Sequence, residues 1–147
     1  MSLATEVDLI RRVPVFSAIG PDKQKLLCFS SERLTFEPGE VLFREGDTAD
    51  AAYVLIDGTV EITVETPGGP LLVNTLGESD VVGETAIFGD VPRTATATAK
   101  TRLEALRVSK DLFLDLVRDN ADAAMEINRI LAARLANTTA RLGAGSA

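Results

Sequence analysis

The middle of the chain consists of short hydrophobic runs separated by glycine, proline and aspartate, a pattern typical of an all-β barrel or sandwich. In residues 59–66, Val60, Ile62 and Val64 alternate with polar residues, which predicts a strand with one buried and one exposed face. The Pro-Gly-Gly-Pro segment at 67–70 predicts the turn of a hairpin. Strands are expected at residues 34–36, 41–44, 52–56, 59–66, 71–76, 94–99 and 103–108.

Both ends of the chain have helical periodicity instead. The pattern predicts a short amphipathic helix over about residues 5–12. A second helix is expected from Pro21 to about Ser31, because proline is favoured at the first position of a helix. After the β region, Ser109 is expected to cap one helix, and a longer helix begins after Asn120.

These elements predict a single domain over residues 5–142. N-terminal helices are expected in 5–33, the β region in 34–109 and C-terminal helices in 110–142. The small and polar residues 143–147 are expected to form a flexible tail. A chain of 147 residues can bury a sizeable core in one domain, and a second full domain is not expected.

The last predicted helix carries a stripe of residues at intervals of three and four, the spacing at which two packed helices meet. Two interpretations stay open. The chain forms a homodimer through this stripe, or the helix lies back on its own β core. The stripe comprises Ala124, Ile127, Leu131, Leu135, Thr138 and Leu142.

Composition excludes several classes of protein. Hydrophobic residues make up 46% and charged residues 25%, which is ordinary for a globular protein, and no apolar run reaches the roughly 18 residues of a membrane span. A net charge of −7 argues against nucleic-acid binding by this chain alone. The charged amino terminus does not resemble a secretory signal, so a cytoplasmic location is expected.

Histidine is absent, which removes the commonest general base and the commonest metal ligand. We therefore expect neither an enzyme nor a metal site. The single cysteine, Cys28, lies in an apolar stretch and is expected to be a buried thiol.

Residues 82–96 contain the most informative combination of side chains. Gly83 lets the backbone approach an anion, and a helical turn at 84–88 would direct amide groups to the same place. Arg93, presented by Pro92, offers a charged fork that fits two phosphate oxygens. Glu84 can accept a hydrogen bond from a sugar hydroxyl. The residues therefore indicate a pocket for a small anion with hydroxyl groups, unless Glu84 and Arg93 only pair with each other or lie solvated on a turn.

The segment GETAIFGDVPRTATATA at 83–99 resembles the phosphate-binding cassette of the cyclic-nucleotide-binding domain family. Residues 36–43, 45–47 and 53–62 resemble the glycine-marked strands and turns that precede the cassette in that family, and the resemblance extends from about Leu9 to Leu142. It implies a mainly β fold with flanking helices, an eight-stranded β-roll of jelly-roll type (a double-stranded β-helix) with two C-terminal helices. It also implies a non-enzymatic sensor that binds cAMP or cGMP and transmits occupancy through those helices.

By this resemblance, Glu84 would bind the ribose 2′-hydroxyl and Arg93 the cyclic phosphate. Backbone amides near Gly83, Thr85 and Ala86 would complete the phosphate cradle.

Other positions concern the choice of base and the packing of the pocket wall. A hydroxyl at Thr94 resembles the arrangement that binds a guanine base held syn, so cGMP is admitted as well as cAMP; the alternative is an ordinary strand threonine. Val82 and Thr85 depart from the family pattern, which has phenylalanine and an aliphatic residue there. Tyr53 is expected in the strand core. The residue that covers the base is not determined, since four positions of the last helix are eligible: Ile127, Ile130, Leu131 and Leu135.

Two alternatives accompany this interpretation. One is a β-roll that has lost its ligand and serves as an interaction or assembly domain. The other concerns the whole protein. The family's regulators continue into a helix-turn-helix, whereas this sequence stops at Ala147. The sequence is therefore expected to be either a shortened regulator or a stand-alone sensor. A jelly-roll enzyme of the cupin type is not expected, because its metal sites use histidine.

Overall fold

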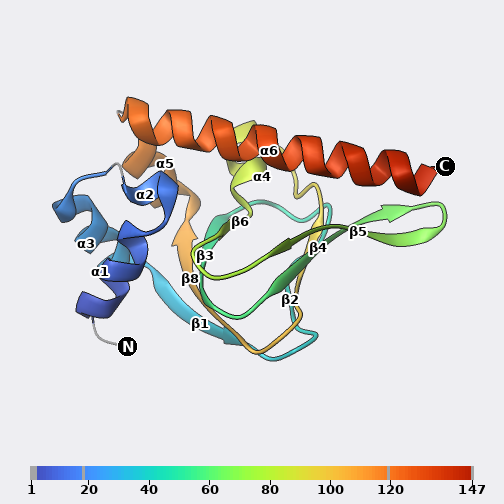
Figure 1. The fold of residues 1–147 in the computed structure, drawn as a ribbon. Coiled ribbons are helices and arrows are strands. Elements are labelled where there is room, and N and C mark those ends of the chain that lie inside the picture. The colour runs from blue at the N-terminus through green and yellow to red at the C-terminus, as the bar shows by residue number, and fades with distance from the viewer. Residues whose placement is uncertain (1–2, 18, 119, 147) are drawn as a thin grey trace.

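The computed structural model describes residues 3–17, 19–118 and 120–146, and its strands form two four-stranded antiparallel sheets (Figure 1). One sheet has the order β1-β8-β3-β6 and the other the order β2-β7-β4-β5. The expected eight-stranded β-roll with flanking helices is therefore confirmed. The strands are β1 (Glu32–Phe36), β2 (Val41–Phe43), β3 (Ala51–Asp57), β4 (Val60–Thr66), β5 (Gly69–Leu76), β6 (Val81–Val82), β7 (Thr96–Ala99) and β8 (Leu103–Ser109).

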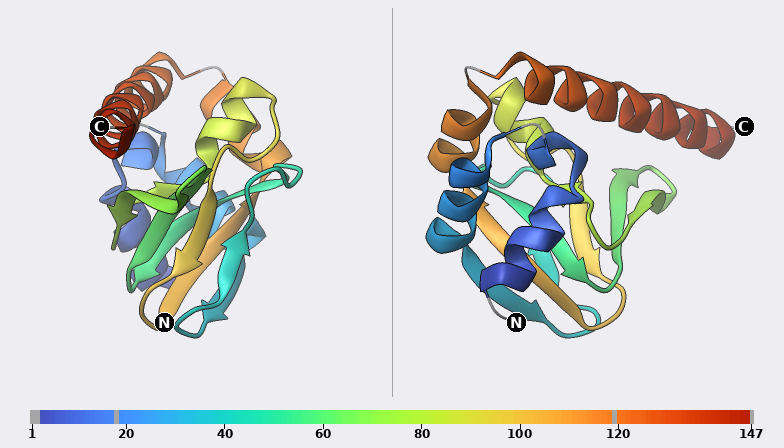
Figure 2. Two further views of the ribbon diagram at one scale, coloured as in Figure 1. Left: turned by 90° about the vertical axis from the view of Figure 1, so that its right-hand side faces the viewer. Right: turned by 60° about the vertical axis from the view of Figure 1, so that its left-hand side comes forward.

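Helices lie at one end of the roll and along its length (Figures 1 and 2). Helices α1 to α3 gather at one end, and the β4–β5 hairpin projects at the other. Helix α6 starts near the first end, where it contacts α2, and runs past β5. The helices are α1 (Leu3–Arg11), α2 (Pro14–Ser17), α3 (Pro21–Ser30), α4 (Glu84–Gly89), α5 (Lys110–Arg118) and α6 (Ala121–Ser146).

Several boundaries differ from those expected. Strand β1 begins at Glu32, inside the region expected to hold only helices, because its register with β8 starts at that residue. Strand β6 has only two residues, too few to produce an alternating pattern, and it exists because it pairs with β3. Likewise, the four-residue helix α2 is too short for a helical period.

The hairpin and the last helix also correct the sequence-based boundaries. Thr66 pairs with Gly69, so the turn contains only Pro67 and Gly68, and Gly69 takes the positive φ of +107° that glycine tolerates. Helix α6 continues to Ser146, through most of the segment expected to be a flexible tail. No proline interrupts that segment, so the backbone hydrogen bonds of the helix can continue through it.

The core consists of two clusters separated by β3. Residues of β3 are buried on both faces: Ala52, Val54 and Ile56 pack with the helices, whereas Tyr53 and Leu55 pack inside the roll. This explains why β3 is hydrophobic without alternation. Tyr53 is thus a strand core residue, as expected.

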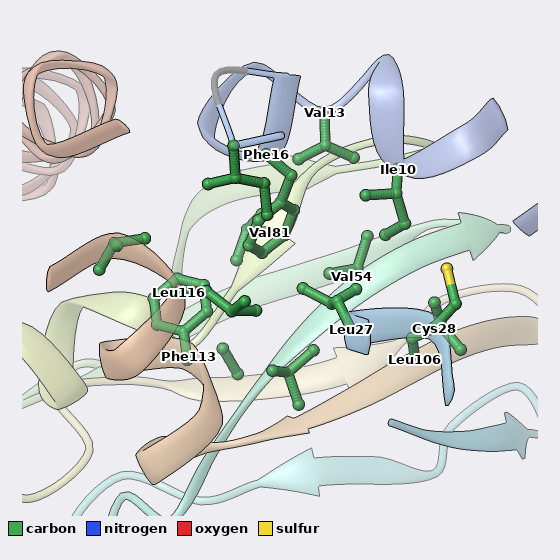
Figure 3. Packing of buried hydrophobic residues seen from close by; sticks show 14 of the residues in the cluster. Ile10, Val13, Phe16, Leu27, Cys28, Val54, Val81, Leu106, Phe113 and Leu116 are labelled. Carbon is green, nitrogen blue, oxygen red and sulfur yellow. The ribbon is translucent and has the colours of Figure 1, made fainter. Parts of the chain in front are cut away.

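The cluster beneath the helices is the larger of the two (Figure 3). Its centre holds Phe16 and Phe113, both fully buried, whose rings meet edge to face with centroids 5.7 Å apart. Cys28 belongs to this cluster, which confirms the expected buried thiol. The cap of α5 is also confirmed, since the amide of Leu112 donates to Oγ of Ser109 over 3.3 Å.

Candidate functional site

A cavity of about 300 Å³ lies between the β2-β7-β4-β5 sheet, the segment from β6 into α4, and helix α6. Its volume is at the lower end of the range for small-molecule sites. One part of its wall is aliphatic, formed by Ile62, Val64, Val73, Leu76, Leu131 and Leu135. Another part comes from the segment that the sequence singled out, with Val82, Gly83, Thr85, Ala86, Arg93 and Thr94.

Two backbone hydrogen bonds fix the position of Arg93, in addition to the contacts of its side chain. Its amide donates to the carbonyl of Asp47, and its carbonyl accepts from the amide of Gly46, both over 2.8 Å. The turn between β2 and β3 thus fixes the residue, which follows α4 and precedes β7. Only 3% of the Arg93 surface is exposed.

The guanidinium group of Arg93 joins three separate elements. Nη1 donates to the carbonyl of Gly83 over 2.7 Å, and Nη2 donates to the carbonyl of Ala51 over 2.5 Å. The guanidinium carbon lies 4.0 Å from the centroid of the Phe43 ring, a cation–π contact. Its Nε is buried and has no hydrogen-bond partner among the residues that the structure describes.

The electrostatic environment of Arg93 is that of a buried cation. Burial lowers the pKa of its guanidinium below the ordinary value, while Tyr53, Asp50, Asp47 and Glu84 oppose that shift. Arginine keeps its proton in proteins, so the lowered pKa measures a cost of burial rather than a loss of charge. A positive charge at the cavity wall, donating to neutral carbonyls, favours an anion as ligand.

Gly83 is required for two independent reasons. Its φ of +91° lies in the left-handed region, where it forms the N-cap of α4. In addition, a Cβ atom here would lie 2.5 Å from Nη1 of Arg93 and 3.1 Å from Cε2 of Phe43. The absent side chain therefore makes room for the stacked guanidinium.

The structure does not place every expected site residue on the cavity wall. Glu84 is the first residue of α4 and is completely buried, and it is absent from the lining. Pro92 is exposed and also does not line the cavity. The remaining expected residues, Val82, Gly83, Thr85, Ala86, Arg93 and Thr94, all line it.

Helix α6 contributes two of the four positions considered for covering the base. Leu131 and Leu135 line the cavity, whereas Ile130 does not. Leu131 packs against the core beneath the helices, while Leu135 is 68% exposed. The side chain of Ile127 lies outside the described residues.

Sequence reasoning missed the cavity residues of β2, β4 and β5. A signal existed for Ile62 and Val64, because the alternation of that strand places both on its buried face. No local signal existed for Phe43 or Asn74, whose roles depend on neighbours that are distant in sequence. Among the described residues, no group of three or more His, Cys, Asp or Glu is placed to hold a metal ion.

Comparison with known proteins gives a consistent result. The family model described as "Cyclic nucleotide-binding domain" matches residues 33–120. The chain is 30% identical over 136 residues to a CRP-like cAMP-activated global transcriptional regulator of Mycobacterium tuberculosis, covering 92% of this chain and 61% of the regulator. It is 35% identical over 108 residues to a cAMP-dependent protein kinase regulatory subunit of Yarrowia lipolytica, covering 74% of this chain and 28% of the subunit.

Among solved structures, the sensor domain of the transcriptional regulator DNR from Pseudomonas aeruginosa superposes with a TM-score of 0.80 at 29% identity, with 90% of each chain covered. The chain spans less than two thirds of both sequence relatives, so their matched parts are regions of longer proteins. No helix in the described parts of the chain is long and apolar enough to cross a membrane.

Proposed function

The chain belongs to the cyclic nucleotide-binding domain family, and from this premise we propose that it is a regulatory module that binds cAMP or cGMP in the cavity beneath α6. The observation that carries the proposal is the Arg93 guanidinium, a buried cation at the cavity wall whose two hydrogen bonds go to neutral carbonyls. A cyclic phosphate carries one negative charge and offers two free oxygens to such a fork. The relatives' printed names, which specify cAMP, support the same class of ligand.

The aliphatic wall of the cavity supports a nucleotide rather than a bare anion. Inorganic phosphate would occupy only the surroundings of Arg93 and leave the apolar lining from β4, β5 and α6 unfilled. A base attached through ribose would fill that space and bury apolar surface. Glu84, next to Gly83, remains our candidate for the ribose 2′-hydroxyl, which requires its enclosed carboxylate to become accessible when ligand binds.

Helix α6 is the element that we propose transmits occupancy. Leu131 and Leu135 form part of the cavity wall, so a ligand that fills the cavity contacts the helix directly. The same helix contacts α2 near its own N-terminal end (Figure 1). A ligand with different affinities for two positions of α6 would shift the population between them, and a partner in the cytoplasm would respond to that shift.

The decisive experiment is titration calorimetry with cAMP and, separately, with cGMP. We expect saturable one-site binding that Arg93→Ala weakens about 10- to 100-fold, because a charge-assisted contact is removed. Arg118→Ala is the matched control, since Arg118 is 65% exposed, pairs with Asp115 in the preceding turn of α5 and lies outside the cavity. This variant removes the same charge and should bind as the wild type does.

Absence of binding would support the competing function. If folded protein, freed of co-purified ligand, gives no heat with either nucleotide at high concentration, the sensor proposal is wrong. The chain would then be a ligand-free β-roll that assembles through its helices. If Arg93→Ala binds as tightly as wild type, the ligand does not use the site described above.

A further inference from the structure

The pairing register of strands β4 and β5 shifts by one residue beside the cavity, at a β-bulge. Thr63 pairs with Leu72, but the preceding residue Ile62 pairs with Asn74, so Val73 is an extra residue in β5. Regular alternation would direct only one of two consecutive side chains toward the cavity. At this bulge both Val73 and Asn74 line it. Asn74 pairs with Ile62 and lies two residues before Leu76, and both of these residues line the cavity. Regular alternation therefore directs Asn74 into the wall, and the bulge adds Val73 beside it.

The surroundings of Asn74 make it chemically distinct. The other residues of β4 and β5 that line the cavity are Ile62, Val64, Val73 and Leu76, all aliphatic. A polar side chain in an apolar wall is unfavourable unless it forms hydrogen bonds. Asn74 is thus the one place on this part of the wall where a ligand can be recognised by hydrogen bonding.

Asn74 and Arg93 lie toward opposite edges of one sheet. In the order β2-β7-β4-β5, Arg93 stacks on Phe43 of β2, while Asn74 belongs to the other edge strand, β5. Helix α6, which contributes Leu131 to the cavity, contacts β5. A nucleotide anchored by its phosphate at Arg93 therefore extends its base toward Asn74.

The orientation of the Asn74 amide is fixed by the chain itself. The backbone amide of Thr75 donates to Oδ1 of Asn74 over 3.0 Å, which assigns the oxygen and leaves Nδ2 as the other group. Nδ2 has no hydrogen bond to any residue within the described ranges 3–17, 19–118 and 120–146. The side chain accordingly offers hydrogen-bond donors to a ligand in the cavity.

We propose that Asn74 is a specificity-determining residue that favours a purine with oxygen at position 6 by donating from Nδ2 to the base. The Hoogsteen edge of guanine presents two acceptors, O6 and N7. Adenine has the same N7 acceptor, but its 6-amino group is a donor, so a hydrogen bond from Nδ2 to position 6 is available only with a 6-oxo purine. Asn74 thus shifts the balance from cAMP toward cGMP.

This inference rests on the proposed function, and its test separates the two. Calorimetry of the wild type and Asn74→Leu is performed with cGMP, cAMP and cyclic IMP, which has the 6-oxygen but lacks the 2-amino group. Loss of one neutral hydrogen bond should weaken cGMP and cyclic IMP about three- to tenfold and leave cAMP unchanged or tighter. Thr75→Val, on the exposed face of the same strand, is the matched control and should leave all three affinities unchanged.

Several results would contradict the inference. If the wild type binds nucleotide and Asn74→Leu leaves the ratio of cGMP to cAMP affinity unchanged, Asn74 does not discriminate. If the variant weakens cAMP selectively, the amide has turned to pair with adenine. Asn74→Asp provides a second measurement, because it replaces donors by acceptors and should move the ratio toward cAMP. If the wild type binds none of the nucleotides, the proposed function itself fails, and this inference fails with it.

Discussion

At the residue scale, the site depends on Arg93 and on two residues that position its guanidinium, Gly83 and Phe43. Gly83 has no side chain where the Arg93 guanidinium lies, and Phe43 provides the ring on which that guanidinium stacks. These two contacts, together with the hydrogen bonds to Gly83 and Ala51, restrain the guanidinium through the packing of the protein itself. A restrained side chain loses less conformational entropy when it binds a ligand.

Gly83→Ala tests the space beside Arg93. The added Cβ would displace Nη1, so we expect nucleotide affinity to fall at least about tenfold, in addition to a loss of about 1–2 kcal/mol of stability from the positive φ. Gly39→Ala is the control, because Gly39 has a φ of +90° but nothing within 4 Å of its Cβ position. Thermal unfolding should show both variants destabilised, and calorimetry should show weaker binding in Gly83→Ala alone.

Phe43→Leu tests the ring beneath the guanidinium. Removal of a cation–π contact of about 1 kcal/mol should weaken nucleotide binding about fivefold. Phe36→Leu is the control, since both rings lie 6.2 Å from the ring of Tyr53 but only Phe43 contacts Arg93. Equal loss of affinity in the two variants would mean that the rings act only through packing of the roll.

At the element scale, α6 combines two different surfaces. Leu131 packs against the core of its own domain, whereas Leu135, one turn later, lines the cavity and is largely exposed. The stripe predicted from the sequence therefore lies partly on the β core, as one of the two interpretations expected. The side chains of Thr138 and Leu142 lie outside the described residues, so the remainder of the stripe stays a prediction.

Leu135→Ala tests whether α6 closes on the ligand. Because the side chain is 68% exposed, its truncation should change the stability of the free protein by less than about 0.5 kcal/mol. If the helix covers the base, calorimetry should nevertheless show weaker binding, by about threefold or more, from lost apolar contact. Met125→Ala is the control on the same helix, since Met125 is 70% exposed and does not line the cavity. Unchanged affinity in Leu135→Ala would show that Leu135 does not contact the bound ligand.

At the scale of the whole molecule, β3 lies between the core cluster beneath the helices and the core cluster inside the roll. Its alternate side chains belong to the two core clusters, so the packing of the helices and the shape of the roll share one strand. Helix α6 contacts both α2 and β5. This arrangement places the helix where occupancy of the cavity can affect a surface outside it.

We predict that this surface includes a homodimer contact through the exposed part of the α6 stripe. Sedimentation equilibrium across a wide range of protein concentration should show a reversible monomer–dimer system. Leu135→Glu should shift it toward monomer, because a charge would be buried in an apolar contact. Met125→Glu, which adds the same charge outside the stripe, should not. If the wild type stays monomeric across the whole concentration range, the prediction is wrong and α6 packs only against its own domain.

The sequence alone determined the features that depend on neighbours along the chain. Alternation predicted the β region and the inward face of β4, helical periodicity predicted the helices at both ends, and the resemblance of residues 83–99 to a phosphate-binding cassette singled out a segment that lines the cavity. Alternation and helical periodicity arise from backbone geometry over a few residues.

Only the tertiary structure decided which distant residues share the cavity. Phe43 lies beneath Arg93 because β2 pairs with β7, and Asn74 enters the wall because it pairs with Ile62 of β4, whose side chain also lines the cavity. The burial of Glu84 and the contact of Leu131 with the cavity likewise depend on how α4 and α6 pack. Register and packing are set by the sum of many weak contacts across the fold, and a shift of one residue reverses the face of every side chain in a strand, so no local pattern could fix them.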